Sequence, residues 1–282
     1  MTPGPTAGTD AESNHAVRLL SFPEQLFNAA EWHWRALLRE YLLRGMAAHD
    51  QPYDMDEISR AGVALDAISA AAASVGVTDV RSDRTDLIVT TDLSSAADFA
   101  TLQGVLDDAV RLTRLEELLQ LPPLPEVIAL RNWICDEVTG QAVGAEPTPW
   151  ELPTEVQPSL GVAAEWDRAI APPESVAWLV GDDQNRIVGA SSTALELLEW
   201  SADELIGQRL LVVIPTSLRE RHVAGFTRSV LLSEDGLLGQ PLHVPALTRT
   251  GREVPIALIL VRHPAPGGRT VYLATLERRA AG

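Results

Sequence analysis

The sequence predicts an α+β protein in which a mainly α-helical region precedes a five-stranded antiparallel sheet with helices on one face. Three observations support this prediction. Residues 17–141 repeat apolar side chains at helical spacing, residues 142–160 hold four prolines and no helical period, and residues 175–279 alternate short apolar runs with turn residues. A chain of 282 residues is long enough for two units, since domains average roughly 150 residues.

The first region contains four predicted helices and one clear strand. The helices are expected over residues 23–48, 54–74 and 94–120 and from Pro125 onward, and the strand over residues 85–93. In the fourth helix the apolar stripe consists of Val127, Leu130, Ile134 and Val138. Residues 1–16 are rich in Gly, Pro, Thr and Ser, and we expect them to form a disordered leader.

The remaining boundaries follow from the change in composition. We assign residues 17–141 to the helical domain, 142–171 to a Pro-rich linker with a short helix around 161–170, and 172–282 to the final domain. This domain begins with a hairpin whose turn is Asp182-Asp183-Gln184-Asn185. Short helical pieces and a longer helix over residues 216–232 follow, and three strands close the domain.

The composition excludes several kinds of chemistry. The chain has 22 basic and 39 acidic residues, so its formal charge is 22 − 39 = −17, and every basic residue is an arginine. Without lysine there is no P-loop lysine, no Schiff base and no protein-kinase lysine. Cys135 stands alone, which excludes an internal disulfide and an all-cysteine metal site.

The same composition bears on location and partners. The acidity argues against binding to nucleic acid or to anionic membranes, because both need basic patches. The N-terminus lacks the features of a signal peptide, and no apolar run approaches the roughly 18 residues of a spanning helix. We therefore expect a cytoplasmic protein. It has no H-E-x-x-H, G-x-S-x-G or G-x-G-x-x-G motif, and we expect no enzymatic activity.

Four stretches of the second region resemble PAS domains. They are WLVGDDQNRIV (178–188), ALELLEWSADELIG (194–207), VVIPTSLRERH (212–222) and RTGREVPI (249–256), and they occur in the element order of that family. The resemblance covers a little over a third of the chain, and it implies the PAS fold and a role in sensing or signalling. Ser191, Trp200 and Thr250 depart from the usual pattern, so no subfamily with a defined ligand is matched throughout.

The first region resembles a different group of proteins. The stretches WHWRALLREYLL (32–43) and LPEVIALRNWICDEV (124–138) are similar to a helical domain found upstream of PAS or ATP-binding modules in actinobacterial regulatory proteins. In that setting the domain accompanies anti-sigma-type signalling. The resemblance implies a protein partner in such a pathway, but it assigns no role to individual residues.

His222 is the most informative candidate site residue. Leu218, His222 and Phe226 share one apolar face of the predicted 216–232 helix, and with Ile214 and Leu242 they are our candidate pocket residues. In haem-binding PAS oxygen sensors, the proximal histidine follows a similar IP-x-x-x-R-x-x-H stretch, so the resemblance maps that role onto His222. Those sensors use an arginine to contact bound oxygen, and Leu242 stands at that position here.

His222 therefore has two possible roles: it is either a haem ligand or a structural residue of the core. Flavin photochemistry is less favoured, because the light-oxygen-voltage subfamily places a reactive cysteine in the helical insertion. Cys135 lies in the other domain, where a small core residue is expected. His33, between two tryptophans, and the pair Asp182-Asp183 are interpreted as structural residues only.

These observations leave two main functional hypotheses. In the first, the PAS pocket senses a small molecule and relays a change to the helical domain or to a partner. In the second, the chain is a ligand-free interaction module that regulates an anti-sigma-type pathway. We also expect a homodimer, because residues 161–170 place Val162, Trp166 and Ile170 on one face of a helix.

Overall fold

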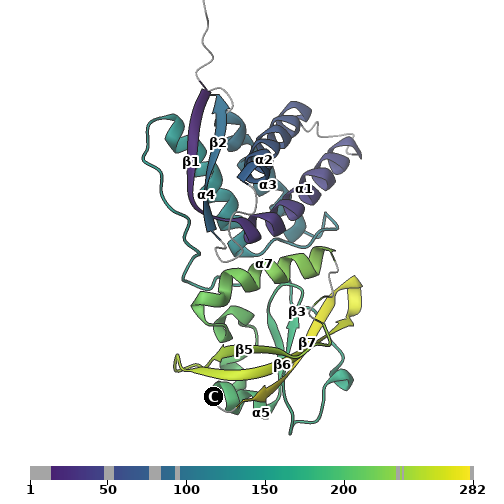
Figure 1. The fold of residues 1–282 in the computed structure, drawn as a ribbon. Coiled ribbons are helices and arrows are strands. Elements are labelled where there is room, and N and C mark those ends of the chain that lie inside the picture. Colours follow the sequence, from purple (N-terminus) through teal and green to yellow (C-terminus); the bar gives the residue numbers. More distant parts are fainter. Residues whose placement is uncertain are drawn as a thin grey trace, which may run out of the picture.

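The chain folds into two units that lie end to end and are joined by an irregular segment (Figure 1). A computed structural model describes residues 14–47, 54–75, 84–92, 96–232, 236 and 238–279. Helices dominate the first unit, and the second is built on a five-stranded sheet. The α+β fold class predicted from the sequence is therefore confirmed.

The first unit combines a two-stranded sheet with four helices. Antiparallel strands β1 (Asn14–Pro23) and β2 (Arg84–Asp92) accompany α1 (Glu24–Ala47), α2 (Met55–Val75), α3 (Ala96–Arg114) and α4 (Pro125–Ala142). In β1, Val17 and Leu19 are buried while Arg18 between them is exposed, as expected for a strand with one face on the core. Because β1 begins at Asn14, the last three residues assigned to the disordered leader belong to a strand.

The helices of this unit follow the predicted apolar pattern, and the stripe of α4 is entirely buried. The third helix is the exception, since α3 ends at Arg114 and not near Gln120. Glu116 adopts a left-handed conformation with φ of 58°, and the Glu117 amide donates to the Leu112 carbonyl 3.0 Å away. This hydrogen-bond pattern terminates the helix and releases residues 115–124 as a loop.

The second unit is a five-stranded antiparallel sheet in the order β4-β3-β7-β6-β5. Its strands are β3 (Ala177–Asp182), β4 (Ile187–Ala190), β5 (Leu242–Leu247), β6 (Glu253–Pro264) and β7 (Thr270–Arg278). The segment between β4 and β5 forms α5 (Ser192–Leu198), α6 (Ala202–Leu205), the 3-10 turn η2 (Leu210–Val213) and α7 (Thr216–Leu232). The helices cover the face of the sheet that carries Leu179, Ile256 and Leu276.

The linker covers the opposite face of the sheet. Trp166 and Ile170 pack on the cluster that contains Trp178 and Leu273, and the Trp166 ring lies directly against Gly189. A side chain at position 189 would collide with that ring, since an added Cβ would lie 2.5 Å from it. The prediction of a helix around residues 161–170 is wrong, except for a 3-10 turn at its end, η1 (Arg168–Ile170).

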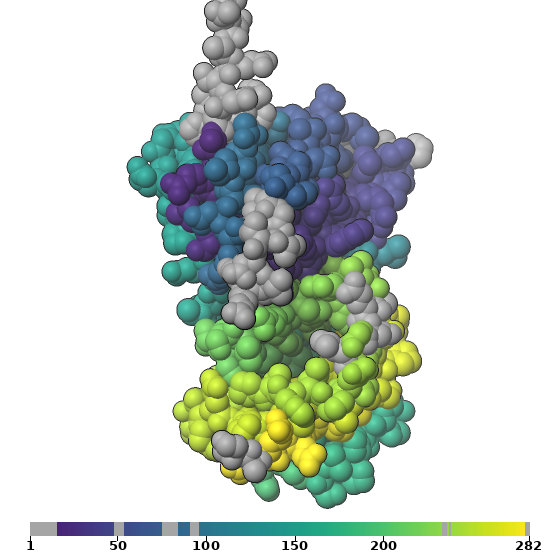
Figure 2. Space-filling view, in the orientation of Figure 1, coloured from purple at the N-terminus to yellow at the C-terminus, as the bar shows by residue number. Residues whose placement is uncertain are grey.

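Part of the second unit packs into the apolar core of the first. Helix α7 lies at their junction (Figure 1), and its Val223 and Ala224 belong to the same buried cluster as the core of the helical unit. In the space-filling view, the units touch along the green band that contains α7 (Figure 2). Within the described ranges, no helix combines the length and apolar character needed to cross a membrane.

Candidate functional site

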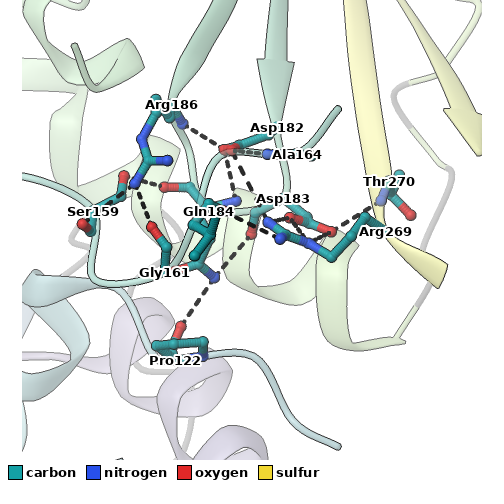
Figure 3. Close-up of polar contacts among 11 residues, drawn as sticks. Pro122, Ser159, Gly161, Ala164, Asp182, Asp183, Gln184, Arg186, Arg269 and Thr270 are labelled. Carbon is teal, nitrogen blue, oxygen red and sulfur yellow. Dashed lines mark hydrogen bonds and ion pairs between the residues drawn. The ribbon is translucent and has the colours of Figure 1, made fainter. Parts of the chain in front are cut away.

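The turn between β3 and β4 is the polar centre of the junction. Sequence analysis predicted an ordinary hairpin turn at Asp182–Asn185, but all four side chains are buried, with exposed fractions between 0% and 4%. Asn185 closes the turn in a left-handed conformation with φ of 60°, which asparagine tolerates better than most residues. Burial of four polar residues is costly unless their hydrogen bonds are made, and Figure 3 shows the polar contacts of Asp182, Asp183 and Gln184.

The two aspartates of the turn bind different parts of the chain. Asp182 accepts hydrogen bonds from the amides of Ala164, Gln184 and Arg186 at 2.9 to 3.1 Å. Burial nevertheless raises its pKa, although these amides partly oppose the shift. Asp183 forms an ion pair with Arg269, whose Nε lies 2.9 Å from Oδ1, and also accepts from the Thr270 amide. The turn is thereby attached to the linker and to the start of β7 (Figure 3).

Gln184 connects the turn to the helical unit. Its Nε2 donates to the carbonyl oxygen of Pro122, 3.1 Å away in the loop that follows α3. The main-chain carbonyl oxygen of Gln184 accepts a hydrogen bond from the Ser159 hydroxyl at 2.7 Å. Gly161 also approaches closely, because a Cβ added there would lie 3.3 Å from the Gln184 side chain. The loop after α3 and the linker therefore both contact Gln184 (Figure 3).

Asn185 connects the turn to α7 through His222. The Asn185 side-chain nitrogen lies 2.8 Å from Nε2 of His222, and the imidazole stacks on Phe226 at a centroid distance of 5.8 Å. Burial, and to a smaller extent the nearby charge of Arg209, lowers the pKa of His222 to about 4. A neutral imidazole can accept the Asn185 hydrogen bond at Nε2, which agrees with this shift.

A buried ion pair reinforces the junction on another side. Arg209, just before η2, is bonded to Glu126 in the first turn of α4, with Nη2 2.9 Å from Oε2. The two side chains are 1% and 4% exposed. Farther along, Glu220 of α7 accepts hydrogen bonds from Arg84 and from the buried Trp150 ring. Trp150 therefore anchors the linker to both units.

A cavity of about 350 Å³ opens beside the turn, between the two units. Residues of the helical unit, the turn, α7 and the sheet all contribute to its walls. The lining residues are His33, Leu119, Gln120, Leu121, Pro122, Leu124, Asp183, Gln184, Phe226, Thr227, Ser229, Val230, Leu231, Arg262, Gly268, Thr270 and Tyr272.

The five predicted pocket residues do not lie together in the structure. Phe226 lines this cavity and contacts Tyr272 across it, with ring centroids 5.6 Å apart. Ile214 packs where the two apolar cores meet, and Leu242 pairs with Leu258 at the far edge of the sheet. Neither they nor Leu218 and His222 are among the residues that line the cavity.

The arrangement does not fit haem ligation by His222. The nitrogen that would bind iron is occupied by the Asn185 amide, and the imidazole does not line the cavity. Flavin adduct chemistry is not supported either, because Cys135 is buried in α4 and burial raises its pKa to about 12. Across the described residues, no group of three or more His, Cys, Asp or Glu side chains is placed to hold a metal ion.

Two residues of this site, His33 and Gln184, were not predicted from the sequence. His33 was interpreted as structural, yet it lines the cavity, and its Nε2 donates to the Leu121 carbonyl 3.0 Å away. Burial lowers its pKa to about 4, so the ring is neutral. Gln184 looked like a turn residue because its partner, Pro122, lies 62 positions earlier. No local pattern signals such a contact.

Comparison with known proteins gives matches only among solved structures. No protein-family model matches the chain, and a search of curated proteins finds no match. A PAS domain from Colwellia psychrerythraea is 17% identical, covers 37% of this chain and 86% of its own, and gives a TM-score of 0.33. The PAS domain of the fruit-fly ELK potassium channel is 15% identical, covers 39% and 90%, and gives 0.32. A PAS domain from a two-component sensor histidine kinase is 10% identical, covers 37% and 85%, and gives 0.31.

Identities and TM-scores this low show only a resemblance. The fold of the second unit is therefore assigned from its own strands and helices. The second unit has the element order expected from the sequence, with two strands, helices ending in the long α7, and three further strands. Its sheet is antiparallel throughout, and its helices lie on one face. The C-terminal unit therefore has the α+β fold that its resemblance to PAS domains implies. The resemblance of the first unit to anti-sigma-associated domains stays a prediction.

Proposed function

We propose that this chain is a signal-transduction module in which the PAS unit senses a small molecule and α7 relays the change to the helical unit. The observation that supports this most is the double role of α7. Val223 and Ala224 pack into the core of the helical unit, whereas Phe226 contacts Tyr272 of the sheet. A shift of α7 on the sheet therefore moves the surface on which α1 rests. The proposal includes no catalytic activity.

The polar contacts at the junction make the docked arrangement specific. The Arg209–Glu126 pair is almost fully buried, so separation of its partners would leave an uncompensated charge. The Gln184–Pro122 hydrogen bond sets the position of the loop after α3 relative to the turn. Contacts of this kind favour discrete arrangements over a continuous range, and a relay needs that property.

Hydrogen–deuterium exchange tests the coupling. The variant Arg209→Gln weakens the junction from the PAS side, and we expect faster exchange in α1 and α4 as well as in α7. The matched control is Arg249→Gln, because Arg249 pairs with Glu204 at the surface of the same unit. It should leave exchange in the helical unit unchanged. If Arg209→Gln affects only the PAS unit, the two units act independently and the relay is rejected.

A second candidate function is protein interaction without a ligand. The uncovered part of the sheet exposes Ile259 and Val261 of β6, each 40% exposed, on the face away from the helices. The homodimer surface expected at residues 161–170 is not free, because Trp166 and Ile170 pack on their own sheet. We propose β6 as the dimer surface instead. Light scattering at about 50 µM, a concentration at which micromolar association registers, tests this dimer surface. A wild-type dimer that is lost in Val261→Asp supports the candidate function, and a wild-type monomer contradicts it.

A further inference from the structure

The outer edge of β2 is an unpaired strand edge. Arg18 of β1 lies opposite Ile88, and its amide and carbonyl both bond to the Gln141 side chain on the side away from β2. Arg18 and Ile88 are therefore a non-hydrogen-bonded pair, so the amide and carbonyl of Ile88 also point away from β1. The same holds two residues to either side, at Asp86 and Thr90. All three residues are exposed, Ile88 by 59%, and no main-chain group of the described residues pairs with them.

Every other strand edge that the structure describes is protected from pairing. The outer edge of β1 is covered by Gln141 and by the linker, whose Trp150 amide donates to the Leu20 carbonyl at 2.9 Å. In the five-stranded sheet, β5 carries Pro245 and β4 has only four residues. Residues 87–91 of β2, in contrast, contain no charged residue, proline or glycine. Charges, prolines and short strands are the usual means of preventing edge pairing, so this edge is free to accept another strand.

The sequence of β2 is suited to pairing with a copy of itself. Ile88 is the middle residue of the nine-residue strand, so a twofold axis at Ile88 pairs the whole of two antiparallel copies. In this register Ile88 faces Ile88, Leu87 faces Val89 and Asp86 faces Thr90. Aliphatic side chains opposite one another stabilise an antiparallel pair. No carboxylate faces another, whereas a register centred on Asp86 would place two of them directly opposite.

We propose that two copies of this chain associate through β2 and form a continuous four-stranded antiparallel sheet in the order β1-β2-β2-β1. The side chains of Leu87 and Val89 from both copies stay on the core side of this sheet, and both Ile88 side chains lie on its exposed side. The surface belongs to the helical unit, so it is separate from the proposed relay through α7 and from the β6 face. A strand edge is a small interface, and we expect a dissociation constant on the order of 10 µM.

Sedimentation equilibrium of the full chain from about 5 to about 200 µM, a range that brackets this constant, tests the proposal. Ile88→Lys and Ile88→Glu each place like charges opposite one another at the twofold axis, so each variant alone should be monomeric. Because the Ile88 side chain is exposed, both should keep a melting temperature close to that of wild type. A mixture of the two should restore the dimer, since opposite charges then face each other. Leu43→Lys is the matched control, because Leu43 of α1 is 56% exposed, and it should dimerise as wild type does.

Cysteine crosslinking tests the register independently. The Cα atoms of a hydrogen-bonded antiparallel pair are about 5.5 Å apart, which is within the range of a disulfide. Ile88→Cys should therefore form a crosslinked dimer on mild oxidation. The two Thr90 residues would be four residues apart along the strands, about 14 Å, so Thr90→Cys should not crosslink. The native Cys135 is buried and does not compete.

Four results would overturn the proposal. They are a wild-type chain that is monomeric at about 200 µM, a dimer that survives in both Ile88 variants, a mixture that fails to restore association, and equal crosslinking of Ile88→Cys and Thr90→Cys. A dimer that is lost in Val261→Asp but kept in Ile88→Lys would place the contact at β6 and reject β2. None of these results bears on hydrogen exchange in Arg209→Gln, so the proposed relay stands or fails separately.

Discussion

Two hairpin turns of the five-stranded sheet consist mainly of polar residues but lie in opposite environments. The β3–β4 turn, Asp182–Asn185, is buried and contacts the linker, the loop after α3, α7 and β7. The β5–β6 turn also consists of polar residues and glycine, but Arg249, Thr250 and Arg252 are exposed. Their partners, Glu199 and Glu204, lie on or next to the short helices α5 and α6.

The difference shows that burial of a turn depends on what is folded over it. Residues 115–124 and 159–164 come from outside the C-terminal unit and contact the first turn, whereas the ion pairs of the second turn are with Glu199 and Glu204 of its own unit. Once covered, the first turn has to satisfy its polar groups without solvent, and the hydrogen bond from Gln184 to Pro122 ties one unit to the other. The first turn thereby forms part of the interface, and the second only reverses the chain.

The largest expected difference between the turns concerns their ion pairs. Asp183→Ala leaves Arg269 without its carboxylate and the Thr270 amide without its acceptor. We expect a loss of about 3–5 kcal/mol in the free energy of unfolding, the range found when one partner of a buried pair is removed. The measurement is urea denaturation.

Glu199→Ala is the matched variant at the exposed turn, where it removes the partner of Arg252. Solvent replaces that interaction, so we expect little change in stability. Equal losses in Asp183→Ala and Glu199→Ala would show that burial does not distinguish the two turns.

The sequence predicted local structure well and long-range contacts poorly. The apolar stripe of α4 and the bounds of α7 follow from side-chain spacing, and the structure confirms both. The helix expected at 161–170 failed because Trp166 and Ile170 find burial against the sheet without helical structure. The site itself was largely missed, since partners such as Pro122 and Gln184 are brought together only by the docking of two units.

The two turns should also differ in how their contributions to stability depend on pH. The buried turn contacts His222, whose pKa falls from 6.5 in the unfolded chain to about 4 in the folded protein. The unfolded state therefore binds more protons between these values, and stability present above pH 6.5 is lost as pH falls toward 4. Between pH 7 and pH 5 we expect His222 to account for on the order of 2 kcal/mol of this loss.

Urea denaturation of wild type and His222→Gln at both pH values measures this contribution. The variant should lose less stability on acidification than wild type. At the exposed turn, hydrogen bonds from Thr250 and Arg252 lower the pKa of Glu199 to about 2, so its carboxylate stays charged throughout this range. Glu199→Gln is therefore the control and should retain the wild-type pH dependence. An unchanged pH dependence in His222→Gln would mean that the buried turn does not respond to acid.

The smallest effect on stability is expected at Gln184. Gln184→Ala removes the hydrogen bond to the Pro122 carbonyl, which costs about 1 kcal/mol, but it also removes the unpaired Oε1 atom, which partly offsets that loss. The structural consequence is larger than the energetic one, because this bond holds the loop after α3 against the turn. Hydrogen exchange should therefore increase in residues 119–124, while Thr250→Ala at the exposed turn leaves that loop unchanged. If the loop stays protected in Gln184→Ala, apolar packing between α1 and α7 suffices to dock the units, and the polar turn adds only specificity to an interface that already exists.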